Sequence, residues 1–340
     1  MRSRRLYLQA SALLVAAAVV LSCLPAAQAQ HPAGADGAWR TVASDAPPVA
    51  RHEHAYVRVG ERFYLVGGRG ERPVQSFDPV SGAWSTHAMP PIELHHFQAV
   101  AHEGKIYVIG ALTGGWPTED PVAHVYIYDP VADAWTQGPA VPEDRRRGAA
   151  GAVVHDGEIF VVAGIRNGHT DGHVRWLDAY DPATGGWRRL ADAPRTRDHF
   201  HAAVLDGKLY AAGGRRSSHA TGQGFELTIP EVDVYDFATD TWTPLPPSGD
   251  LPTERAGTTV AVLDGRLLVL GGESGSQVPA HAEVEAFDPE TGTWTALAPM
   301  RVGRHGMQAV VYEQKVYVAS GSKTRGADEV DSQEVYSQTP

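Results

Sequence analysis

The sequence predicts an all-β protein made of six repeated four-stranded units, and three recurring features carry this prediction. Six tryptophans recur at intervals of 45, 51, 52, 55 and 52 residues: Trp39, Trp84, Trp135, Trp187, Trp242 and Trp294. An aromatic–Asp turn precedes each of the last five, as in Tyr128-Asp129-Pro130. Upstream of each turn, and once more near the C-terminus, an apolar run ends in two small residues: Gly67-Gly68, Gly110-Ala111, Ala163-Gly164, Gly213-Gly214, Gly271-Gly272 and Ser320-Gly321. A period of about 50 residues without sustained helical periodicity favours short strands over a helical solenoid.

Within one unit the four strands can be placed in order. A tight turn joins the first two strands; in the fourth unit, residues 202–205 and 208–210 flank Asp206-Gly207. Asp-Gly between short apolar runs is a strong hairpin signal, because Gly adopts the positive φ that a two-residue turn needs. The second strand ends in the small-residue pair, and a variable segment follows. The third strand ends in the aromatic–Asp turn, and the fourth carries the tryptophan.

This three-part repeat resembles the Kelch repeat family, in which each unit is one blade of a β-propeller. The resemblance covers about residues 39 to 337, so the predicted fold is a six-bladed Kelch β-propeller at residues 39–340. The last unit stops near Tyr336 without a tryptophan, and Trp39 has no strands before it. We therefore expect the strand that carries Trp39 to complete the last blade and close the ring, which leaves no exposed sheet edge at the seam.

Residues 1–29 are predicted to be a secretory signal peptide, followed by a linker at 30–38. Arginines open this segment, an apolar stretch spans 6–24, and small residues at Ala27 and Ala29 form a cleavage site. The mature protein is then periplasmic or secreted and has no transmembrane span. A retained membrane anchor and lipid attachment at Cys23 are the alternatives.

Charge and cysteine content exclude several classes of function. The net charge is -11, and removal of a signal peptide with three arginines and no acidic residue takes it to -14. Nucleic-acid binding is excluded, because phosphate contacts need a basic surface. The one cysteine lies in the signal peptide, which excludes a disulfide framework and a four-cysteine zinc site. We expect a monomer without a cofactor.

The long, variable connections are predicted to meet on one face of the ring, and this face gathers Arg and His. Because strand direction alternates within a blade, segments that enter the first strands emerge beside those between the second and third strands. Twelve of the sixteen histidines map to this loop face. When the units are aligned on their first turns, one position holds Ala50, Leu94, Arg147, Arg197, Arg255 and Arg304. The next position holds Arg51, His95, Gly148, Asp198, Ala256 and His305.

This pattern predicts a binding mouth on the loop face. Arg makes bidentate hydrogen bonds with carboxylates, so the face suits an anionic small molecule, a glycan or a protein partner. Trp116, outside the repeat register, is a candidate to stack on a sugar ring. The candidate ligand-binding residues are Arg51, His54, His95, Arg147, Arg197, His201, Arg255, Arg304, His305 and Trp116. The structural alternative pairs each arginine with a carboxylate of a neighbouring blade, for which Glu53, Asp198 and Glu254 lie close enough in sequence.

A catalytic alternative follows from a second resemblance. In architecture the chain is similar to exported six-bladed Kelch proteins that act as sialic-acid mutarotases or epimerases. Opening and closing a sugar ring needs a positioned acid–base pair, for which the candidates are His199 with Asp198 or Glu254. That family carries a long insertion between the second and third strands of a blade, and no segment here is as long.

No metal site is predicted. Galactose oxidase-type copper radical enzymes share the Kelch fold, but their cofactor needs a cysteine cross-linked to tyrosine, which this chain lacks after processing. A plain histidine site stays open, because His52/His54 and His199/His201 each place two imidazoles on one side of a strand. The two pairs fall on opposite blades, so we expect them to share no ion.

Overall fold

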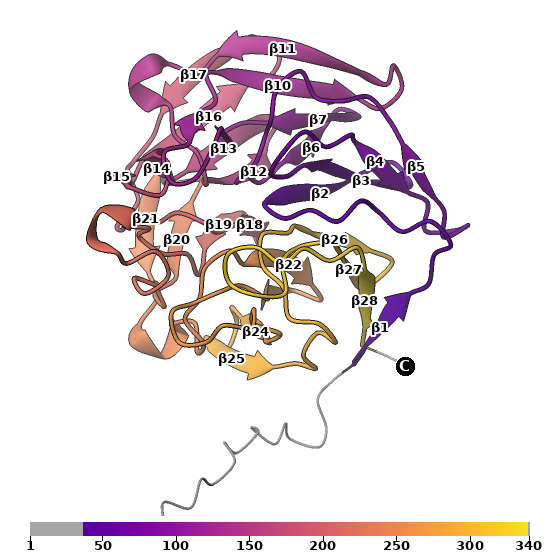
Figure 1. The fold of residues 1–340 in the computed structure, drawn as a ribbon. Coiled ribbons are helices and arrows are strands. Elements are labelled where there is room, and N and C mark those ends of the chain that lie inside the picture. The colour runs from indigo at the N-terminus through magenta and orange to yellow at the C-terminus, as the bar shows by residue number, and fades with distance from the viewer. Residues whose placement is uncertain (1–36, 339–340) are drawn as a thin grey trace, which may run out of the picture. The chain divides into compact units, whose positions relative to one another are not determined.

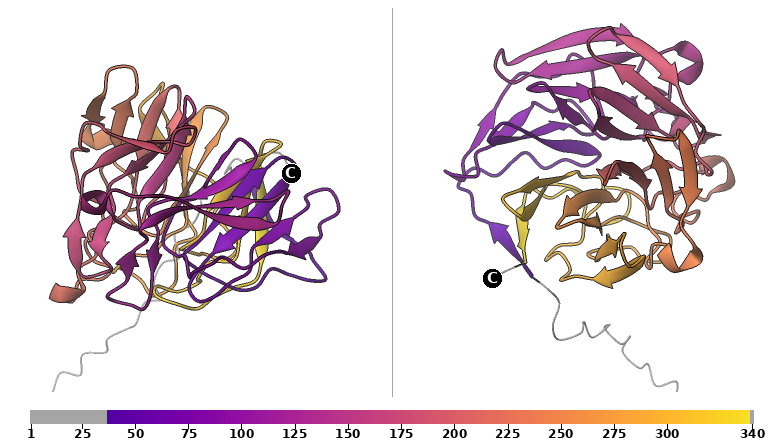
Figure 2. Two further views of the ribbon diagram at one scale, coloured as in Figure 1. Left: turned by 90° about the horizontal axis from the view of Figure 1, so that it is seen from above. Right: turned by 180° about the vertical axis from the view of Figure 1, so that it is seen from behind.

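The computed structural model describes residues 37–338, so the predicted signal peptide and nearly all of the linker lie outside the described residues. Within this range, six four-stranded antiparallel sheets surround a common axis (Figure 1, Figure 2). The all-β, six-bladed fold predicted from the repeat is confirmed. No helix in residues 37–338 is long and apolar enough to cross a membrane.

Each blade runs from an inner first strand to an outer fourth strand, and the first strands of adjacent blades contact one another around the axis. Blade 1 comprises β2 (His54–Val59), β3 (Arg62–Gly67), β4 (Gln75–Phe77) and β5 (Trp84–Thr86). Blade 2 comprises β6 (Val100–His102), β7 (Lys105–Val108), β10 (His124–Asp129) and β11 (Ala134–Ala140). Blade 3 comprises β12 (Gly151–His155), β13 (Glu158–Val162), β16 (Leu177–Asp181) and β17 (Gly186–Arg189).

The remaining blades repeat this order. Blade 4 comprises β18 (Ala202–Leu205), β19 (Lys208–Ala211), β20 (Asp233–Asp236) and β21 (Thr241–Pro244). Blade 5 comprises β22 (Thr259–Leu263), β23 (Arg266–Leu270), β24 (Val284–Asp288) and β25 (Thr293–Ala296). Blade 6 has β26 (Ala309–Tyr312), β27 (Lys315–Ala319) and β28 (Gln333–Ser337). Two small hairpins extend the loop segments of blades 2 and 3: β8 (Leu112–Thr113) with β9 (Asp120–Pro121), and β14 (Ile165–Asn167) with β15 (Asp171–His173).

The N-terminal strand supplies the fourth strand of blade 6. β1 (Ala38–Val42) pairs antiparallel with β28, with Trp39 opposite Tyr336. In Figure 1 and Figure 2 the indigo strand lies beside the yellow C-terminal strand. The indole Nε1 of Trp39 also donates a 2.9 Å hydrogen bond to the Ala298 carbonyl, in the segment that leaves blade 5. The two ends of the propeller are therefore joined by backbone pairing and by a buried aromatic contact.

The core is divided among the six interfaces between blades. One cluster of buried apolar side chains lies at each interface, and the cluster between blades 6 and 1 includes Phe63, Phe77 and Tyr317. The small-residue pairs let the next blade approach closely. A Cβ on Gly271 would lie 2.2 Å from the Arg304 carbonyl oxygen. This arrangement buries a core without one large central layer, which explains how the chain exceeds the usual single-core length.

Candidate functional site

The segments that enter the first strands meet around the axis in a closed belt of backbone hydrogen bonds. One residue in each segment has a left-handed conformation, with φ from +50° to +62°: Glu53, His96, Ala149, His199, Gly257 and Gly306. From blade 2 to blade 6, each amide in this set donates to the carbonyl of the preceding member, and the His54 amide closes the belt by donating to Gly306. Four members are not glycine, so the belt holds them in a conformation that costs about 1–2 kcal/mol each.

This equivalence corrects the alignment of the first unit. The first hairpin turns between the paired residues Val59 and Arg62, so Arg51 and not Ala50 is equivalent to Arg147. Glu53 consequently joins His96 and His199 in the axial belt.

The five arginines that precede the belt are buried and make their polar contacts within their own blades. Arg51, Arg147, Arg197, Arg255 and Arg304 are at most 3% exposed. Each donates to backbone carbonyls and to a side chain on the third strand of the same blade. The partners are, in order, Gln75, Asp178, Asp233, Glu285 and Glu334. The arginines therefore have the structural role of the alternative. Its prediction of partners on a neighbouring blade, and of Glu53, Asp198 and Glu254 in particular, is wrong, because each guanidinium contacts the third strand of its own blade.

The partner of each of these arginines stands at a fixed position in the repeat. It stands two residues before the aromatic residue at the end of the third strand, as Asp178 stands before Tyr180 and Glu334 before Tyr336. Blade 2 has Leu94 in place of the arginine and Tyr126 in place of the acid, and both lie in one apolar cluster. Blade 2 thus lacks both the arginine and its polar partner, and replaces the pair with two side chains that pack in one apolar cluster.

A cavity of about 440 Å³ lies on the axis at the loop face. Trp116 and Phe225 form part of its wall, and charged and imidazole side chains form the rest. It is lined by His52, Glu53, Arg69, His96, Trp116, His169, Arg215, His219, Gly224, Phe225, Glu273, His305, Gly326 and Ala327. A second, much smaller pocket of about 20 Å³, called here the axial pocket, has His54, His199 and His201 among its lining residues.

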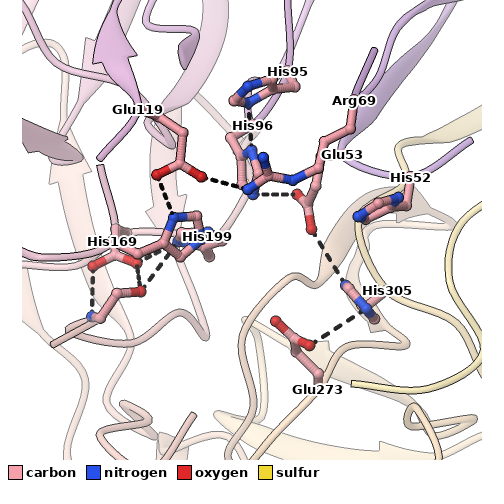
Figure 3. Close-up of polar contacts among 12 residues, drawn as sticks. His52, Glu53, Arg69, His95, His96, Glu119, His169, His199, Glu273 and His305 are labelled. Atoms are coloured by element: carbon pink, nitrogen blue, oxygen red, sulfur yellow. Dashed lines mark hydrogen bonds and ion pairs between the residues drawn. The ribbon is translucent and has the colours of Figure 1, made fainter. Parts of the chain in front are cut away.

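One chain of polar contacts crosses blades 1 to 4 at the base of the cavity (Figure 3). Arg69 forms an ion pair with Glu119, whose other carboxylate oxygen lies 2.9 Å from Nδ1 of His169. Nε2 of His169 lies 2.8 Å from Nε2 of His199. Nδ1 of His199 in turn contacts the buried carboxylate of Asp198. Residues from four blades are thus connected through two adjacent imidazoles.

A second chain of contacts crosses blades 2, 1, 6 and 5 (Figure 3) and continues to Arg215 of blade 4. Nε2 of His96 lies 3.5 Å from Glu53, and the other oxygen of Glu53 lies 3.4 Å from Nδ1 of His305. Nε2 of His305 lies 3.3 Å from Glu273, which accepts a 2.5 Å hydrogen bond from Arg215. Glu53, Glu119 and Glu273 therefore offset the positive charge that was predicted for the mouth.

The two chains of contacts shift the ionisation of their members. Burial disfavours the charged form of His305, but Glu273 and Glu53 raise the pKa of its imidazole above the ordinary value. Burial opposes ionisation of Glu53 as well, but His96 and His305 hold the pKa of its carboxyl well below the usual range. For Glu119, His169 and Arg69 outweigh burial and lower the carboxyl pKa to about 2. These carboxylates are charged at neutral pH, and His305 carries a proton more readily than a free histidine.

The other predicted site residues lie in different places, and not all of them line the cavity. Trp116 stands at the cavity rim with 59% of its surface exposed, and its ring contacts the ring of His219. His54 and His201 line the axial pocket and not the cavity. His95 is buried beside His96. Glu254 is exposed and lines a separate depression with Ser274, so it forms no acid–base pair with His199.

Sequence reasoning missed the carboxylates of the cavity. Arg69, Arg215 and Glu273 each follow directly after a small-residue pair. The backbone of this position pairs with the segment that enters the first strand, as Asp198 pairs with Arg215 and Ala256 with Glu273. In blades 1, 4 and 5, the residue that follows the small-residue pair therefore lines the cavity.

Comparisons with known proteins agree with this architecture. Residues 34–279 match the Attractin/LZTR1 beta-propeller family. The Kelch-like protein terF of Aspergillus terreus is 29% identical over 311 residues, which are 86% of this chain and 66% of that protein. Kelch-like protein 23 of Homo sapiens is 27% identical over 79% of this chain and 45% of its own length. The chain thus spans only part of these relatives.

A solved structure, titled "Structure of YjhT", superposes with a TM-score of 0.71 at 16% identity, covering 85% of this chain and 95% of the other. It shows the shared fold. Together with the repeat, the six blades and the family match over most of the propeller, it leads to one conclusion: the chain belongs to the Attractin/LZTR1 beta-propeller family of Kelch-repeat proteins.

Proposed function

We propose that this propeller binds a small, hydroxyl-rich organic molecule, of the size of a monosaccharide, in the cavity at the centre of its loop face. One observation carries the proposal: the cavity of about 440 Å³ combines an aromatic wall with charged groups that converge on one space. Pockets for small molecules typically measure about 300–1,000 Å³ and have this mixture of apolar wall and few polar groups.

The charges of the cavity favour hydroxyl groups over a simple anion. Arg69 and Arg215 already pair with Glu119 and Glu273, so a ligand carboxylate would have to replace a buried ion pair. Hydroxyl groups donate to carboxylates and accept from Arg and His at once, and the exposed ring of Trp116 offers a face for stacking. A glycan thus fits better than the other two ligand classes predicted from the sequence, an anionic small molecule and a protein partner. The Kelch-like relatives support a protein partner on the same face as the competing proposal.

Saturation-transfer NMR with a neutral hexose, an N-acetylhexosamine and a sialic acid tests the proposal. We expect binding of at least one sugar, lost in Trp116→Ala and Phe225→Ala. Val131→Ala is the matched control, because Val131 is an exposed apolar residue in the turn between the third and fourth strands of blade 2. No binding of any of the three sugars, or binding that survives both cavity substitutions, contradicts the assignment.

A sugar mutarotase or epimerase is the second candidate function, and one contact favours it. His305 lies between Glu53 and Glu273 and faces the cavity, so an acid and two bases stand within reach of a bound sugar. The predicted pair of His199 and Asp198 is less suited, because neither residue is among those that line the cavity. Anomer equilibration followed by NMR should accelerate with wild type and not with His305→Gln. A rate equal to that in buffer removes this activity for the sugar tested.

A further inference from the structure

We propose that His96, His169 and His199 bind one divalent transition-metal ion at the base of the cavity. The three imidazoles come from the segments of blades 2, 3 and 4 that reach the axis (Figure 3). One ring nitrogen from each lies within 4.8 Å of the other two. Their ring centroids are 4.6–5.0 Å apart, and all three residues are buried. The inference does not depend on the identity of the organic ligand.

The outer nitrogen of each imidazole is already held by a second group. Nδ1 of His169 contacts Glu119 at 2.9 Å, and Nδ1 of His199 contacts Asp198. Nδ1 of His96 lies 2.6 Å from Nδ1 of His95. Histidines that ligate metals typically present the other ring nitrogen to a carboxylate or similar partner, which orients the ring and fixes its tautomer. This support is therefore in place for all three candidate ligands.

The arrangement of lone pairs points to a cation. When Nδ1–H of His169 and of His199 each donate to a carboxylate, both Nε2 atoms carry a lone pair, and these atoms lie 2.8 Å apart. Two lone pairs at this distance repel each other unless a proton or a metal ion lies with them. A shared proton involves only two nitrogens, but a third imidazole, that of His96, approaches the same point. The convergence of three rings favours a metal ion.

The chemistry of the ligands narrows the ion. Three neutral imidazoles suit Zn²⁺, Cu²⁺, Ni²⁺ or Fe²⁺ and do not suit Mg²⁺ or Ca²⁺, which prefer oxygen. Tetrahedral bonds of about 2.0 Å set ligand nitrogens roughly 3.3 Å apart. The nitrogens of His169 and His199, 2.8 Å apart, therefore need to separate by about half an ångström, and that of His96, up to 4.8 Å away, needs to move closer. Because His96 and His169 line the cavity, a coordination position opens to it. Glu53, 3.5 Å from Nε2 of His96, is placed to take that position when no ligand does.

Metal titration of the wild-type protein is the first test. Protein treated with EDTA is titrated with ZnSO₄ by calorimetry, and metal content is measured by mass spectrometry. We expect about one Zn²⁺ per chain, a rise in the melting temperature on Zn²⁺ addition, and visible absorption bands of four-coordinate Co²⁺ after substitution. Absence of Zn²⁺ uptake by the folded wild type overturns the proposal. So does an imidazolium proton shared by His169 and His199 that persists in excess Zn²⁺ by nitrogen-15 NMR.

Conservative variants locate the site. His169→Gln and His199→Gln should each weaken Zn²⁺ binding by more than about 100-fold, and Glu119→Gln by about 10–100-fold. His102→Gln is the control, since His102 ends β6 beside the turn to β7, away from the strand end that meets the axis. Unchanged affinity in both ligand variants contradicts the assignment. Sugar binding is measured separately with and without Zn²⁺, so the loss of one function does not decide the other.

Discussion

Replacement of Arg304 by Met tests whether the buried arginines hold the blades or bind ligand. Arg304 is fully buried in the blade that closes the ring. Its guanidinium donates five hydrogen bonds, to the Val302, Ser320 and Ser332 carbonyls, to the Ser332 hydroxyl and to Glu334 at 2.6 Å. Methionine fills much of the volume but satisfies none of these acceptors.

The expected loss follows from the partner left behind. Glu334 is also fully buried, and without Arg304 it keeps only the amides of Arg301 and Val302 as donors. Removal of one member of a buried ion pair typically costs about 3–5 kcal/mol. At about 2 °C per kcal/mol for a domain of this size, the melting temperature should fall by about 6–10 °C. Differential scanning calorimetry and urea unfolding measure both quantities.

Two further variants make the reasoning refutable. Arg301→Met applies the same change to an exposed side chain of the same segment and should alter stability by less than about 0.5 kcal/mol. Glu334→Gln added to Arg304→Met removes the uncompensated charge and should recover part of the loss. An Arg304→Met protein of unchanged melting temperature that has lost ligand binding would refute the structural role and restore the prediction made from sequence.

Three other predictions concern the closure of the ring by β1, the axial pocket and the contacts between blades. Trp39→Ala should destabilise the propeller by about 3–5 kcal/mol in urea unfolding, because it removes a buried ring and its bond across the seam; a cost below 1 kcal/mol would show that β1 does not close the ring. Burial lowers the pKa of His54 to about 3, against 6.5 for the unfolded chain, so only the unfolded chain takes up this proton between those values. Protonation of His54 in the unfolded chain therefore lowers the free energy of unfolding by about 2 kcal/mol as the pH falls from 6.5 to 5, and has little effect above pH 6.5. Urea unfolding at several pH values measures this decrease, and His54→Gln should remove it. Gly271→Ala should lower the melting temperature far more than Gly265→Ala: both have positive φ, but a Cβ at Gly271 meets the neighbouring blade, whereas one at Gly265 meets nothing within 4 Å.

Much of the fold could be predicted because the residues that specify each hairpin lie close together in the sequence. Each blade consists of hairpins whose strands are neighbours in sequence, and turn residues such as Asp206-Gly207 specify where each hairpin reverses. Even the contact with the largest sequence separation, between β1 and β28, follows from counting one tryptophan too many at the start and one too few at the end. The register of blade 1 was misplaced by one residue because its turn, Gly60-Glu61, has glycine at the first central position, whereas the turns with glycine in blades 2 to 5 have it at the second.

The role of the arginines was harder to predict, because residue type does not reveal direction. Arg304 and Arg215 are both buried and both pair with a glutamate, yet only Arg215 lines the cavity. Arg304 precedes the first strand of blade 6 and pairs with Glu334 of its own blade, whereas Arg215 follows the second strand of blade 4 and pairs with Glu273 of the next blade.

The sequence by itself determined the repeat, the number of blades and the face that gathers histidine, because hairpin periodicity and turn residues act over a few positions. Only the tertiary structure decided which histidines meet. His96, His169 and His199 lie 30 or more residues apart and become neighbours because three blades converge on one axis. It also decided the charge of the mouth: Glu53 and Glu273 line the cavity, and Glu119 and Glu273 pair with the cavity arginines Arg69 and Arg215 and offset their charge. Contacts between blades depend on how the ring closes, and the spacing of residues within one blade does not encode them.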